Sequence, residues 1–78
     1  MSELPTWNEI AGHALASLNE ARLGLSNARD WMNSDWSDGH GPADHEKRHE
    51  AAQLIREAKQ LIEQAKDALR ASAERVAR

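Results

Sequence analysis

Histidines near the middle of the chain are the residues whose types and spacing could do chemistry. His45 and His49 are four residues apart, so they share one face of a helix, and His40 precedes them by a few positions. Neutral imidazoles with a nearby carboxylate suit zinc, nickel or copper ions. His40, His45 and His49 are therefore weak candidates for a surface metal site, and solvated side chains at the start of a helix are the plainer interpretation.

Other catalytic patterns in the sequence are incomplete. Glu46 and His49 match the Glu-x-x-His spacing of di-iron bundles, but both fall on the outer side of that segment's apolar positions, whereas iron ligands must point into a core. The chain has no cysteine, and Gly39-His40-Gly41 lacks the spacing of a phosphate-binding loop. The sequence therefore predicts a protein that is not an enzyme and that needs no cofactor.

The charge balance bears on the class of partner. The formal net charge is -3, and residues 1–41 carry two basic and six acidic side chains. Because phosphate contacts supply most of the affinity for nucleic acid, a nucleic-acid-binding regulator is a disfavoured alternative. No apolar run approaches the roughly 20 residues of a membrane span, and no signal peptide is visible. We expect no membrane association and a cytoplasmic location.

Two long segments with helical composition must position all of these residues. The 78 residues allow one domain, 1–78, with a helix over about 6–33, a loop over about 34–42 and a helix over about 43–77. Thr6 and Glu9 have the spacing of a capping box at the first helix start. The loop concentrates Ser, Asp, Gly and Trp, and Pro42 suits the first turn of the second helix.

Apolar residues recur in both segments with alternating three- and four-residue steps. These seam positions are Leu4, Trp7, Ala11, Ala14, Leu18, Ala21, Leu25, Ala28 and Met32, then Ala51, Ile55, Ala58, Ile62, Ala65, Leu69, Ser72 and Val76. If the chain folds back, Leu25 faces Ala51 or, one heptad along, Ala58, and large side chains meet small ones in either register. The sequence predicts an all-α antiparallel two-helix hairpin with a coiled-coil-like seam.

Each segment also carries apolar or small residues beside its seam. Ile10 and Gly24 flank the first seam, and Leu54, Leu61 and Ala68 flank the second. A stripe this wide is typical of a multi-helix bundle, and a lone hairpin needs less. These five residues are the predicted interface of a homodimer that completes a four-helix bundle, because twofold dimers are the commonest soluble oligomers.

Tryptophan and methionine gather where the chain turns. Trp31, Met32 and Trp36 are candidates for binding a partner protein, and Leu15 and Leu23 are further candidates because they lie off the seam. The sequence therefore predicts a small homodimeric regulator, inhibitor or adaptor that binds another protein. In size and acidity it resembles helical hairpins among bacterial regulators and phage-encoded proteins. The metal-binding and nucleic-acid-binding alternatives stay open.

Overall fold

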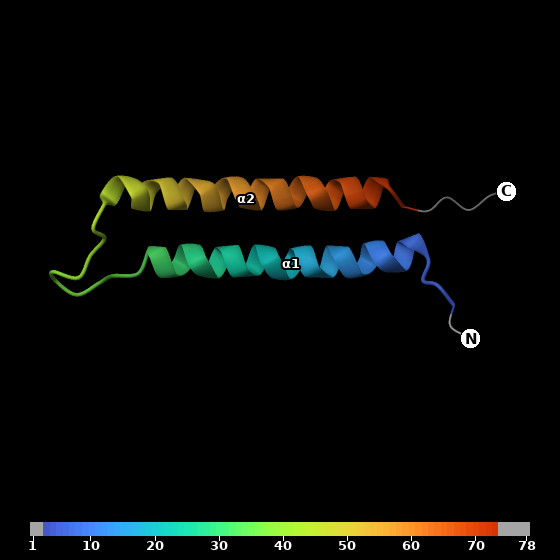
Figure 1. The fold of residues 1–78 in the computed structure, drawn as a ribbon, viewed down its shortest axis with the longest axis horizontal. Helices are drawn as coiled ribbons and strands as arrows, with labels where there is room; N and C mark the ends of the chain where they lie inside the picture. The colour runs from blue at the N-terminus through green and yellow to red at the C-terminus, as the bar shows by residue number, and fades with distance from the viewer. Residues whose placement is uncertain (1–2, 74–78) are drawn as a thin grey trace.

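The structure is a computed structural model that describes residues 3–73. Two helices, α1 (Trp7–Met32) and α2 (His45–Ala71), run antiparallel and side by side, joined by residues 33–44 (Figure 1). Neither helix of the described chain combines the length and the apolar character that crossing a membrane requires. The all-α hairpin predicted from the seam pattern is confirmed.

Side-chain caps determine where both helices begin. Thr6 Oγ1 accepts the backbone N–H of Glu9 at 3.1 Å, as its position in the capping box predicts. Asp44 Oδ1 accepts the N–H groups of Glu46 and Lys47 at 2.9 and 3.1 Å. Because Asp44 is the cap, α2 begins at His45, and Pro42 precedes the helix instead of occupying its first turn.

The far end of α2 and the connection also differ from the predicted ranges. The helix ends at Ala71, where the N–H of Ser72 bonds to the carbonyl oxygens of the last turn, and Val76 lies outside the described residues. In the connection, His40 donates its N–H to the Ser37 carbonyl at 2.9 Å. Gly39 makes this tight turn possible with a φ of 79°, a conformation that favours glycine.

Three contacts fix how the helices pair. Trp7 Nε1 donates to Ser72 Oγ at 3.1 Å, and Arg22 Nε lies 2.9 Å from Glu63 Oε1. At the loop end, an Arg48 N–H donates to the Met32 carbonyl at 2.9 Å. The central pair lies nearer the register with Leu25 opposite Ala58, whereas the contacts at the two ends lie between the two predicted registers.

The seam buries little, and part of it differs from prediction. Ala11 and Lys66 are the buried residues of the described chain, and no large side chain in it is fully buried. Ala21 and Ala65, predicted in the seam, are exposed, because a straight helix rotates each heptad position by about 20° away from its partner. Lys66 takes the place of Ala65, and Leu4, also predicted in the seam, is 92% exposed.

The hairpin is an elongated single layer. Its extents are 66 × 26 × 14 Å, and its radius of gyration is 18.8 Å, against about 11.5 Å for a compact domain of this length. Its accessible surface is 6706 Å², against about 4,700 Å² for a compact monomer of this mass. The chain as a whole therefore leaves about 2,000 Å² more surface in solvent than a compact monomer of its mass.

Candidate functional site

One broad side of the hairpin is apolar. Helical periodicity places the flanking residues of both helices on this side, because they are rotated in the same sense away from the seam. We call it the apolar face, and it comprises Ile10, Ser17, Ala21, Gly24 and Trp31 of α1 with Leu54, Ala58, Leu61, Ala65 and Ala68 of α2. The residues named here carry no charge, whereas Lys47 and Glu50 lie on the same side of α2 near the loop, because they precede Ala65 and Ala68 by about five whole helical turns.

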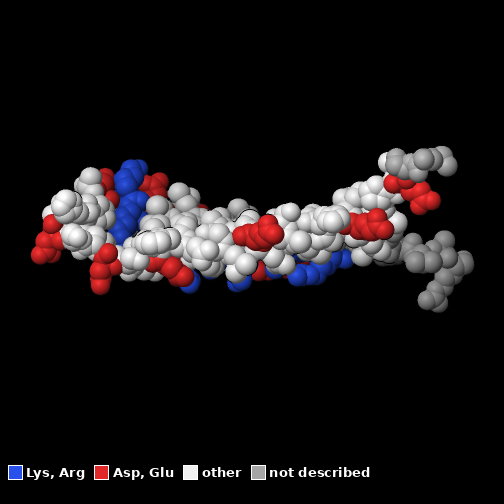
Figure 2. All heavy atoms as spheres, turned by 90° about the horizontal axis from the view of Figure 1, so that it is seen from below, with Lys and Arg blue, Asp and Glu red and all other residues white. Residues whose placement is uncertain are grey.

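All five predicted dimer-interface residues lie on the apolar face. Leu54 and Leu61 are 55% and 62% exposed, Ile10 is 43% exposed, and Gly24 and Ala68 are also exposed. The structure therefore joins two flanking stripes, one from each helix, into a single continuous surface. Figure 2 views the molecule edge-on: Lys and Arg lie along its lower edge, and a further group reaches the upper edge near the loop end.

The opposite side carries a groove between the helices. This basic groove has a volume of about 330 Å³ and is lined by Arg22, Arg29, Asn33, Ala52, Ile55, Arg56, Lys59, Gln60 and Glu63. Four of its nine side chains are cationic and one is anionic. The hairpin is therefore two-sided, with an uncharged apolar face and a cationic groove behind it.

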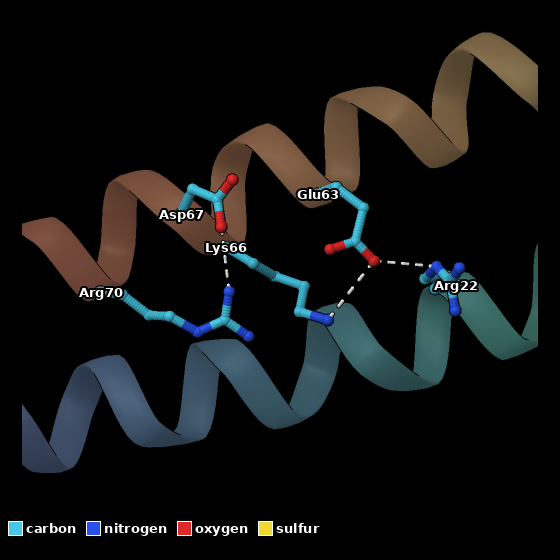
Figure 3. A network of polar contacts seen from close by, with 5 residues as sticks. All are labelled: Arg22, Glu63, Lys66, Asp67 and Arg70. Carbon is cyan, nitrogen blue, oxygen red and sulfur yellow. Dashed lines mark hydrogen bonds and ion pairs between the residues drawn. The ribbon is translucent and has the colours of Figure 1, made fainter.

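An ion-pair network borders the basic groove. Glu63 Oε1 lies 2.9 Å from Arg22 Nε and 3.6 Å from Lys66 Nζ, so one carboxylate joins the two helices (Figure 3). The Lys66 side chain is only 10% exposed and extends across the seam towards α1, whereas Arg22 and Glu63 are about half exposed. Farther along α2, Arg70 pairs with Asp67 at 3.0 Å. The network helps to hold the register, and the Glu63 carboxylate balances the positive charge of Arg22.

Three of the predicted partner-binding residues meet at the loop end. Trp31, Met32 and Trp36 line a second hollow of about 330 Å³, which we call the tip cluster, together with Ser34, Asp35, Pro42 and Arg48. Trp31 is 79% exposed and Trp36 is 47% exposed, while Met32 is half-buried. The tip cluster thus presents two indole rings to solvent at one end of the molecule.

Arg48 organises the tip cluster. Its guanidinium carbon lies 5.6 Å from the centre of the Trp36 ring, a cation–π distance, and one of its N–H groups donates to the Met32 carbonyl. The backbone of Gly41 packs directly against the Trp36 indole, since a Cβ at position 41 would come within 2.8 Å of Trp36 Cε2. Trp36 is therefore held in place, whereas Trp31, on the last turn of α1, is 79% exposed.

The other two predicted partner-binding residues lie elsewhere. Leu15 is half-buried beside the seam, in the half of α1 far from the loop, and Leu23 is 64% exposed on the outer edge of α1. The structure does not bring either of them to the tip cluster. They form no common surface with the tryptophans.

The histidines do not assemble a metal site in the part of the chain that the structure describes. His40, His45 and His49 are exposed, and among residues 3–73 no group of three or more His, Cys, Asp or Glu side chains converges to hold an ion. Glu46, the other di-iron candidate, is exposed on the first turn of α2.

The basic groove and the role of Arg48 were not identified from the sequence. The cations of α1 in the groove, Arg22 and Arg29, are one heptad apart, and those of α2, Arg56 and Lys59, are three residues apart. This spacing signals that each pair shares a helix face. Whether the two pairs line one groove depends on how each helix is rotated about its own axis at the seam, and the spacing within one helix does not give that rotation.

Comparisons of the chain with protein-family models, curated proteins and solved structures gave no match.

Proposed function

We propose that this chain is a non-enzymatic protein-binding module that works as a homodimer. Two hairpins pack through their apolar faces into a four-helix bundle, and the bundle binds a target protein as a cytoplasmic regulator, inhibitor or adaptor. The observation that supports this proposal is the exposed apolar face, on which Leu54 and Leu61 are more than half exposed.

A second copy of the chain fits the apolar face best. The face is uncharged and contains small residues such as Gly24 and Ala65, so two copies can approach closely without burying an ion. A standard interface covers about 800 Å² on each partner, well within the hairpin's additional surface of about 2,000 Å². Twofold pairing would also give each hairpin the second layer that it lacks.

The tip cluster is the surface proposed to bind the target. It lies at the end of the hairpin, so most of it stays accessible when the faces pair. Exposed tryptophan is enriched among residues that dominate binding energy, and Met32 supplies an adaptable apolar neighbour. Trp36 is already oriented by Arg48, which lowers the entropy lost on binding.

Thiol labelling tests the homodimer. The chain has no native cysteine, so Ala65→Cys reports on the apolar face and Gln64→Cys on the outer edge of the same helix. We expect the thiol at 65 to react at least about tenfold more slowly at high protein concentration, because the second copy covers it, and the difference to vanish on dilution. Equal rates at every concentration would remove the homodimer from the proposal.

Affinity capture tests the target-binding claim. We expect the wild-type dimer to retain a defined protein from its native lysate, and the Trp36→Ala variant, which leaves the apolar face unchanged, to lose that protein. Glu20→Ala, on the outer edge of α1, serves as the control and should retain it. Retention that survives Trp31→Ala and Trp36→Ala alike would show that the tip cluster does not bind the target.

A further inference from the structure

The basic groove concentrates positive charge on an acidic chain. The whole sequence has a formal net charge of -3, yet the groove brings together Arg22, Arg29, Arg56 and Lys59 around the single carboxylate of Glu63. Like charges this close repel each other unless an anion lies between them. The groove is therefore arranged to attract a negatively charged group.

Two of the four groove cations have no carboxylate partner among the described residues. Glu63 pairs with Arg22, and Arg29 has only the exposed Asp30 carboxylate beside it, at 3.5 Å. Arg56 donates to the neutral amide oxygen of Gln53 at 2.6 Å. Within residues 3–73, no carboxylate forms an ion pair with Lys59. The cations of α2 are thus available to an outside carboxylate.

The floor of the groove indicates which kind of anion fits. Ala52 and Ile55 form an apolar strip between the cations, and the amides of Asn33 and Gln60 stand at its margins. A phosphate backbone gains little from an apolar strip, and the net negative charge of the chain opposes a long polyanion. A peptide with carboxylates flanking an aliphatic side chain matches both the cations and the strip.

From this complementarity we propose that the basic groove binds an acidic, amphipathic segment of the target protein. This inference rests on the proposed function, since it assigns the chemistry of the target. The groove lies opposite the apolar face, so it stays open on both sides of the homodimer. It extends from Arg22 of α1 to Asn33, the residue that caps the end of α1, about 16 Å, the length of about three helical turns of a bound segment.

Calorimetric titration with a designed peptide tests the inference. The probe is a capped helical peptide of about 15 residues, with glutamates on both sides of a leucine stripe, and the comparison peptide carries glutamine in place of every glutamate. We expect the acidic peptide to bind the full-length protein at least about tenfold more tightly than the neutral peptide, and its binding to weaken as salt rises.

Charge-matched variants locate the binding. The double variant Arg56→Gln, Lys59→Gln should weaken binding of the acidic peptide at least about tenfold, because both free cations of α2 are lost. The double variant Lys47→Gln, Arg70→Gln removes the same charge outside the groove and should stay within about twofold of wild type.

Several results would overturn the inference. Equal binding of the acidic and neutral peptides, or equal weakening by both double variants, would show that the groove does not select carboxylates. A short single-stranded RNA that binds more tightly than the acidic peptide, and loses binding in Arg56→Gln, Lys59→Gln, would assign the groove to nucleic acid. If the target still binds this double variant through the tip cluster, the inference fails while the proposed function stands.

Discussion

Replacing Leu54 by lysine tests whether the apolar face is the dimer interface or contributes to the packing of a single hairpin. Leu54 is 55% exposed in the single hairpin, so the substitution removes little packing from one copy. Lysine is a good helix former, and Glu50 and Glu57 lie four residues before and three residues after it, which favours a cation at this position. Helix content should therefore be retained.

The expected effect on the homodimer follows from the exposed fraction. Burying a whole leucine side chain stabilises by about 1.5–3 kcal/mol, so covering the exposed 55% contributes about 0.8–1.6 kcal/mol per copy. Twofold symmetry doubles this to about 1.6–3.3 kcal/mol, which is about a 15- to 250-fold change in the dimer dissociation constant. Desolvation of two ammonium groups adds to the loss.

Sedimentation equilibrium over a range of protein concentrations measures this change, with circular dichroism to confirm that the helices remain. Gln64→Lys is the matched control, because it adds the same charge on the outer edge of α2 and should leave the dimer within about twofold of wild type. If Leu54→Lys self-associates like the wild type, or if Gln64→Lys dissociates as strongly, the apolar face is not the dimer interface.

Three further substitutions test the structure of the hairpin itself, each by chemical unfolding at one protein concentration. Asp44→Ala should destabilise the protein by about 0.5–2 kcal/mol through loss of the α2 cap, whereas Asp44→Asn should keep most of the wild-type stability. Equal stability of Asp44→Ala and wild type would show that α2 starts elsewhere. Arg48→Ala should destabilise by about 1–2 kcal/mol and change the fluorescence of Trp36, because the hydrogen bond to Met32 and the cation–π contact are lost together; an unaltered spectrum would contradict the contact. Lys66→Met should leave stability unchanged or raise it by up to about 1 kcal/mol, because attraction to a carboxylate 3.6 Å away offsets little of the free energy that the ammonium loses when it leaves water. A loss of stability above about 1 kcal/mol would show that the ion pair holds the seam.

The features that the sequence predicted are the local and periodic ones. The Thr6 cap depends on residues a few positions apart, and the antiparallel hairpin depends on two seams separated by a glycine-containing turn. The start of α2 was misplaced because both Pro42 and Asp44 are suitable near a helix N-terminus, and only the backbone shows which residue caps it.

The features that were missed depend on the rotation of each helix about its own axis. An ideal heptad pattern keeps Ala65 in the seam, but a straight helix carries it out and brings Lys66 in. The basic groove has the same origin, because it needs Arg22 and Arg56 to turn towards the same side. The contact of Arg48 with Trp36 joins the loop to α2, and no spacing rule describes it.

The molar mass of the unmodified chain, measured by light scattering at micromolar concentration, tests most directly whether a second copy covers the apolar face. Pairing predicts a mass about twice 8.7 kDa, falling towards the single-chain value on dilution. A mass of 8.7 kDa at every concentration, with both helices intact and cooperative unfolding, would contradict it.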